Sequence, residues 1–272
     1  MRIYRRFSKF KIYMYFWLIF TAVFILYNEV FSYYFNTRNW YKLKCENEND
    51  CTKILLVADP QIIGNNKEII HFLTPISILD SDSQFTARWA TLSPADYKEA
   101  LYVQKPFHIW LPGDNDIGGE DTLVTPEKLK RFERAFSQPS LISFKNITLF
   151  KINRLTSYIP VYQKERYFYD INQIFIGLSH VPLMFKPSTF VDKVINKMLP
   201  HLLFTAHEHK SMIISTDALL RQDFHIVPVT PDNNRVFKYT LGTTDMYEIL
   251  IPTCSYRMGT TKIGYGYAIL GM

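Results

Sequence analysis

Four short apolar segments of this chain each end directly in residues with carboxylate, amide or imidazole side chains. The segments cover residues 53–58, 108–112, 173–178 and 202–206, and the polar residues that follow them are Asp59 with Gln61, Asp114 with Asn115 and Asp116, His180, and His207 with His209. Segments this short and apolar are typical of buried parallel strands. Because open α/β folds build their sites at the carboxyl ends of strands, the pattern predicts an α/β fold with its site at one sheet edge.

The remaining elements fit the same fold class. Residues 126–136 place Leu129, Phe132 and Phe136 at helical spacing, and residues 190–199 predict a second helix. Residues 147–152 predict a further strand, and residues 236–239, 247–252 and 265–270 predict late antiparallel strands. A chain of 272 residues that is 47% hydrophobic can bury one full core, so we expect one catalytic-size domain with an anchor.

Each polar segment also has a simpler interpretation. Residues 114–116 could form an ordinary Asx turn, Asp59 could cap a helix, and a lone histidine such as His180 is more often structural than a ligand. Four such strand ends in one chain favour a shared metal site instead, and His207 and His209 would point the same way from an extended loop. Mixed nitrogen and oxygen ligands suit Mn, Fe or Zn better than Ca. Since paired metals of this kind serve phosphoester hydrolysis, we predict a metal-dependent hydrolase.

The N-terminal segment predicts a membrane anchor. Five basic residues precede residue 12, and residues 12–27 carry no charge. With residues 30–35 this segment approaches the roughly 20 residues that span a bilayer, and the basic residues ahead of it favour a cytosolic N-terminus. We therefore expect a cytosolic tail at 1–11, a transmembrane signal anchor at 12–35, a linker at 36–52 and a lumenal domain at 53–272. A cleaved signal peptide or a buried core helix is the alternative.

Two features agree with a lumenal domain. Asn146 begins a glycosylation sequon, and Cys45 and Cys51 flank a short polar loop that a disulfide could close. Nearly all of the formal charge of +6 comes from the N-terminal basic residues, so the charge gives no reason to expect a nucleic-acid partner.

The order of these motifs resembles that of the calcineurin-like metallophosphoesterases. The motifs are Asp59-Pro60-Gln61, residues 112–118 (PGDNDIG), residues 179–183 (SHVPL), residues 206–209 (AHEH) and residues 252–259 (PTCSYRMG). The resemblance covers about residues 50–270 and is strongest to the membrane-anchored branch that removes ethanolamine phosphate from GPI anchors.

This resemblance implies a four-layer αββα sandwich around two divalent metals, with manganese the expected cofactor. It also implies GPI-anchored proteins or the GPI glycolipid as substrate, contact with a lipid bilayer, and a place in the endoplasmic reticulum, its exit sites or the Golgi during ER-to-Golgi transport.

The family's site residues map onto this chain by motif. Asp59 and His209 would ligate the first metal, and His180 and His207 the second. Gln61 stands where the family has a metal-binding histidine, and Asp114 where it has a metal-binding asparagine. Asn115 stands where the family has the histidine that assists the leaving group, and Asp116 would orient that neighbour.

One family motif is missing. The family carries a Gly-Asp-x-x-Asp motif whose first aspartate bridges both metals, but Gly113-Asp114, the chain's one Gly-Asp pair, is already assigned. We therefore expect an incomplete domain, although Asp80 or Asp82 could fold back and substitute.

Three hypotheses follow. The chain is a working lumenal phosphodiesterase, a catalytically impaired relative that binds GPI cargo or one metal without turnover, or a membrane-anchored structural protein whose histidines are incidental.

Overall fold

The computed structural model describes residues 2–31, 34–35, 51–59, 109–119, 122–161, 173–219, 221, 223–230, 236–242, 244–255 and 260–271. The chain divides into two compact units, residues 1–48 and 49–272. The first unit contains helix α1 (Arg2–Leu26), which continues into a π-helical turn, η1 (Tyr27–Phe31). Within the described ranges no helix is both long enough and apolar enough to cross a membrane, so the transmembrane anchor expected at 12–35 is unsupported.

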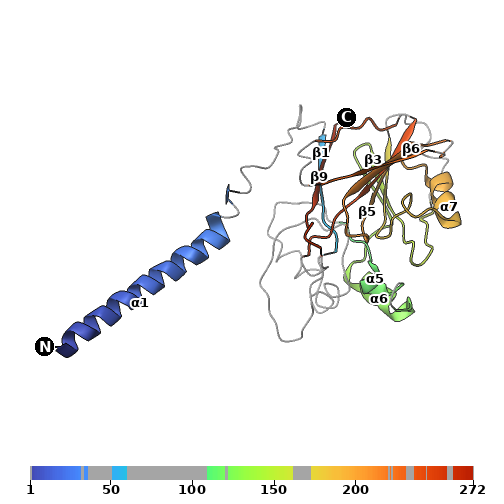
Figure 1. The fold of residues 1–272 in the computed structure, drawn as a ribbon. Helices are drawn as coiled ribbons and strands as arrows, with labels where there is room; N and C mark the ends of the chain where they lie inside the picture. The colour runs from blue at the N-terminus through green and yellow to red at the C-terminus, as the bar shows by residue number, and fades with distance from the viewer. Residues whose placement is uncertain are drawn as a thin grey trace. The chain divides into compact units, whose positions relative to one another are not determined.

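The second unit is a mixed α/β fold built on a seven-stranded sheet (Figure 1). In chain order its strands are β2 (Leu141–Phe144), β3 (Ile147–Lys151), β4 (Ile174–Leu178), β5 (Leu202–Thr205), β6 (Met212–Asp217), β7 (Phe224–Pro228) and β8 (Asp245–Leu250). In space the order is β2-β3-β4-β5-β8-β6-β7. The central strands β3, β4, β5 and β8 run parallel, and the outer strands pair antiparallel. The α/β fold class predicted from the sequence is therefore confirmed.

A second, two-stranded sheet pairs β1 (Cys51–Leu56) with β9 (Gly266–Gly271). The pairing is antiparallel, so the prediction of a parallel strand before Asp59 is wrong. The apolar residues of β1 did not distinguish a parallel from an antiparallel strand, because the end of this strand packs into hydrophobic clusters on both sides. Leu56 packs into the cluster shared with the large sheet, and Val57 packs into a different cluster on the other side.

Three helices in the described part of the second unit cover the sheets. Helix α7 (Thr189–Met198) buries Val191, Val194 and Ile195 against one face of the large sheet (Figure 1). Its N-terminus is capped by Ser188, whose hydroxyl accepts a hydrogen bond from the Val191 amide. Helices α5 (Asp114–Ile117) and α6 (Pro126–Ala135) contribute to the cluster around Val57. The hydrophobic clusters thus give the order α7, large sheet, β1–β9 pair, and α5 with α6.

Most predicted elements are confirmed, and two are wrong. Helices α6 and α7 and strands β3, β4, β5, β8 and β9 lie within two residues of their predicted bounds. Residues 236–239 form no strand, and residues 109–111 are buried but belong to none of the named strands of the described chain. The amide of Trp110 instead donates to the side chain of Gln138. Strand β8 is antiparallel only to β6, since it runs parallel to β5.

His201 makes the stability of this sheet sensitive to acid. Its Nδ1 accepts a hydrogen bond from the Phe175 amide at 2.9 Å, and its ring stacks on that of Phe175. Burial lowers the pKa of His201 below its ordinary value of 6.5, so this contribution to stability is present above pH 6.5 and is lost as the pH falls through the folded-state pKa.

We predict that the free energy of unfolding falls below pH 6.5, and that the fall is smaller in His201→Asn, whose Oδ1 can accept the same hydrogen bond without titrating. Urea unfolding at pH values from 7.5 to 5 measures this fall in the wild type and in the variant. An equal pH dependence in the two proteins would contradict this role for His201.

Candidate metal centre

Asp114 enters the site at the start of α5. The carboxylate of Asp116 accepts a hydrogen bond from the amide of Gly113 at 2.9 Å, which fixes the first turn of this short helix. The helix ends at Gly118, whose φ is 86°, and a Cβ there would lie 2.4 Å from the carbonyl oxygen of Leu123. Glycine is required at that position, because any side chain would meet backbone. The turn therefore has a fixed start and a fixed end around Asp114.

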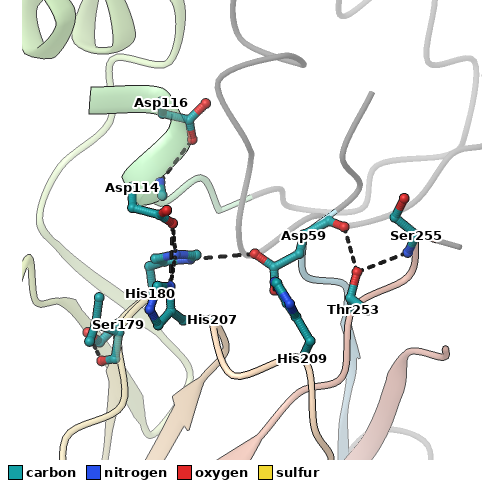
Figure 2. Close-up of polar contacts among 11 residues, drawn as sticks. Asp59, Asp114, Asp116, Ser179, His180, His207, His209, Thr253 and Ser255 are labelled. Atoms are coloured by element: carbon teal, nitrogen blue, oxygen red, sulfur yellow. Dashed lines mark hydrogen bonds and ion pairs between the residues drawn. The ribbon is translucent and has the colours of Figure 1, made fainter. Parts of the chain in front are cut away.

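His180 and His207 follow two neighbouring parallel strands, β4 and β5. The amide of Ala206 donates to the carbonyl of His180 at 2.9 Å, so the two strand ends are joined directly. Nε2 of His180 lies 2.6 Å from Oδ1 of Asp114 and 3.1 Å from Nδ1 of His207. Nδ1 of His207 lies 3.4 Å from the same Asp114 oxygen. Figure 2 shows the three side chains meeting at one point.

Asp59 and His209 lie beside this group. Oδ2 of Asp59 is 3.8 Å from Nε2 of His209, and Oδ1 of Asp59 is 3.9 Å from Nδ1 of His180 (Figure 2). The ring of His180 therefore has Asp114 on its Nε2 side and Asp59 on its Nδ1 side. His207 approaches Asp114 and His209 approaches Asp59, and their positive φ values show that the loop which carries them is not extended as expected.

The backbone at three of these residues has an uncommon conformation. Asp59, His207 and His209 have φ values of 49°, 69° and 53°, all in the left-handed region. This region is uncommon for residues other than glycine, and strained residues of this kind cluster at functional sites. Left-handed residues bend the loop after β5, so it is not extended at His207 and His209. Three of the five converging residues thus hold an unfavourable backbone conformation.

The charges in the group favour a bound cation. Burial alone would raise the pKa of the Asp114 carboxyl, but hydrogen bonds and charge from His180 and His207 hold it well below its ordinary value. Burial, with a smaller effect from the charges of His207 and His180, lowers the pKa of His209, which keeps its imidazole neutral with a lone pair available. A carboxylate and neutral imidazoles are the metal-binding forms of these groups, so a cation bound here would replace the positive charge that His180 and His207 place beside Asp114.

Asp114, His180 and His207 form a group that could hold a metal ion. They offer one carboxylate oxygen and two imidazole nitrogens, all within 4.8 Å of one another. Such a donor set fits a transition-metal dication better than Ca²⁺, which prefers oxygen ligands alone. Asp59 and His209 offer a second oxygen–nitrogen pair next to it.

The other predicted site residues lie outside this group. Asn115 is exposed on α5, next to Asp114, and Asp116 is buried and contacts the Gly113 amide. Asn146 is half-buried in the turn between β2 and β3. Gln61, Cys45, Asp80 and Asp82, together with the side chain of Cys51, fall outside the described residues, so their assignments stay predictions.

Thr253 supports the site, although no role was predicted for it. Its hydroxyl donates to the carbonyl of Asp59 at 2.9 Å, and the amide of Ser255 donates to that hydroxyl. Thr253 also bridges Ala58, and the amide of Cys254 donates to the carbonyl of Ala58. The late Pro-Thr-Cys-Ser segment therefore holds the backbone of Asp59 in its left-handed conformation. Its resemblance to the family motif was the only sequence signal for this.

We predict that His207→Ala and His209→Ala each weaken Mn²⁺ binding by at least about tenfold, or about 1.4 kcal/mol. Each should change the free energy of unfolding by only about 1 kcal/mol, because these side chains are 13% and 25% exposed at the rim of the sheet. Calorimetric titration with Mn²⁺ and urea unfolding measure the two effects. His225→Ala, an exposed histidine on β7, is the matched control. Full Mn²⁺ affinity in both rim variants would refute the assignment.

Comparison of the chain with protein-family models, curated proteins and solved structures found no match. The family resemblance therefore stands on its sequence motifs, and the metal centre stands on the geometry of the five converging residues.

Proposed function

We propose that this chain is a metal-dependent phosphodiesterase related to the calcineurin-like metallophosphoesterases. The observation that carries the proposal is the convergence of Asp114, His180 and His207, with Asp59 and His209 beside them. These residues come from four separate segments of the chain, and each was selected from the sequence as a ligand. An incidental histidine cluster gives no reason for a buried aspartate and left-handed loop residues at the same point.

The arrangement of the layers supports the same proposal. Helix α7, the seven-stranded sheet, the β1–β9 pair and helices α5 and α6 follow one another in the order that a four-layer αββα sandwich requires. The candidate ligands lie where strands of both sheets end, since Asp59 follows β1 while His180 and His207 follow β4 and β5. We therefore assign the fold to that architecture as part of the proposal.

Each residue has a chemical task in this proposal. A bound divalent cation would supply an activated water and screen the charge of the phosphate. Asp114, His180 and His207 would hold it, and Asp59 and His209 would hold a second, weaker site. Asn115, exposed beside Asp114, would donate an amide hydrogen bond to the leaving oxygen. Because an amide cannot transfer a proton as a histidine can, hydrolysis should favour substrates with acidic leaving groups.

The substrate and location rest on the family resemblance. We propose ethanolamine phosphate on GPI anchors as the substrate group, with GPI-anchored proteins or the glycolipid as partners at a membrane of the endoplasmic reticulum or Golgi. Lumenal placement would make Asn146 available to glycosylation.

A relative that binds one metal without efficient turnover is the second candidate. Its support is the asymmetry of the site. Asp114, His180 and His207 form one tight group of three ligand atoms. Asp59 and His209 form only a pair, and the described residues place no further carboxylate beside that pair. Two dications placed close together repel each other, and a bridging carboxylate would reduce that repulsion.

We predict that the purified protein binds at most one Mn²⁺ tightly. It should hydrolyse a phosphodiester with an unactivated alcohol leaving group roughly 10²–10⁴-fold more slowly than a complete relative, which is the contribution of a general acid, and the deficit should be smaller for bis(p-nitrophenyl) phosphate. Metal analysis after dialysis and a turnover assay in Mn²⁺ measure these values. Asp114→Ala, which removes the ligand oxygen, should remove the residual turnover, and its urea-unfolding midpoint shows whether the fold is kept.

Two tightly bound metals with fast turnover would show that an acid other than Asp59 and Asp114 bridges the two metals. Absence of any bound metal in the intact protein would refute the proposed function.

A further inference from the structure

Glu248 is an acidic residue at the centre of the large sheet. It lies on β8, its side chain is 0% exposed, and its strand neighbours Met246 and Leu250 belong to the apolar cluster under α7. A buried carboxylate is costly unless hydrogen bonds compensate for the lost water. The side chain therefore has a role that a leucine at the same position would not fill.

Three donors converge on this carboxylate. The amide of Leu183 donates to Oε1 at 2.6 Å, the amide of Phe185 donates to Oε2 at 2.8 Å, and the hydroxyl of Thr205 donates to Oε1 at 3.0 Å. Replacing the carboxylate by an apolar side chain would leave two buried amides unpaired.

The three donors belong to the two segments that present the histidines. Leu183 and Phe185 lie in the loop that follows His180, and Thr205 ends β5, two residues before His207. Glu248 itself lies on the next strand, opposite Leu203 of β5. One carboxylate thus holds the loop after β4 and the end of β5 at a fixed separation.

Surface contacts restrain the same loop more weakly. The guanidinium of Arg154 donates to the carbonyl oxygens of Pro182 and Lys186, and Lys186 forms an ion pair with Glu208, which lies between the two rim histidines. Lys186 is half exposed, and exposed ion pairs contribute little. The buried carboxylate is therefore the principal restraint.

We propose that Glu248 is a positioning residue of the metal centre, which sets the distance and orientation of His180 relative to His207. The expected effect of Glu248 on metal binding rests on the proposed function, whereas its effect on the positions of the two histidines does not. Partners that orient metal ligands typically contribute 10- to 100-fold to metal affinity.

The test compares Glu248→Gln with Met246→Ala. The glutamine keeps the shape but turns an amide NH₂ group toward one backbone donor, while Met246→Ala disturbs the same strand and cluster without removing these bonds. Both would be made in the full chain, and their thermal midpoints would be compared. One readout is the ¹⁵N ring signals of His180 and His207 in metal-free protein, and the other is Mn²⁺ affinity.

We expect Glu248→Gln to displace both ring signals and to weaken Mn²⁺ binding at least tenfold, while Met246→Ala, with a similar loss in thermal midpoint, leaves both near wild type. Ring signals and affinity that match between the two variants would overturn the proposal. If the wild type binds no Mn²⁺, the proposed function fails, and the ring signals alone decide whether Glu248 positions the two histidines.

Two milder substitutions at Thr205 provide the test if Glu248→Gln does not fold. Thr205→Val removes the donor on the His207 side, and Thr205→Ser restores it. Displacement of the His207 signal in the valine variant, with recovery in the serine variant, supports the proposal. An unchanged His207 signal in Thr205→Val overturns it.

Discussion

The parallel pairing of β4 with β5 is the constraint on which the rest of the site depends. Parallel neighbours end at the same sheet edge, so the residues that follow them meet without a long loop. Here the backbone bond from Ala206 to His180 joins those ends, and it brings His180 and His207 within reach of one carboxylate. Asp114 needs only a short capped turn to complete the group.

The remaining ligand positions require more support, because they adopt backbone conformations that the chain does not favour. Asp59, His207 and His209 are all left-handed, and each such residue costs of order 1–3 kcal/mol. The structure supplies buried anchors nearby. Thr253 holds the carbonyl of Asp59, and Glu248 holds the segments beside His180 and His207. Thr253 and Glu248 thus restrain the segments that carry the candidate ligands, three of which hold left-handed conformations.

The sequence predicted the sheet and the ligands better than their mutual geometry. Short apolar segments ending in Asp59, His180 and His207 identified the strands and their polar ends, because burial and strand ends leave a local pattern. The pairing of β1 could not be predicted, since a strand that is covered on both sides is apolar whether it pairs parallel or antiparallel. The bend of the loop that carries His207 and His209 was also hidden, because positive φ values at non-glycine residues have no simple sequence signal. Glu248 was visible only as an acid within an apolar strand, and its three donors are distant in sequence.

The most direct test of the metal centre is anomalous diffraction at the manganese edge from crystals of the protein grown with Mn²⁺. The account predicts a peak at about 2.0–2.2 Å from an oxygen of Asp114 and from ring nitrogens of His180 and His207, the usual range for such ligands. Asp59 and His209 should lie next to that peak, with weaker density or none between them. Absence of a peak among Asp114, His180 and His207, or a peak only at other residues, would contradict the account.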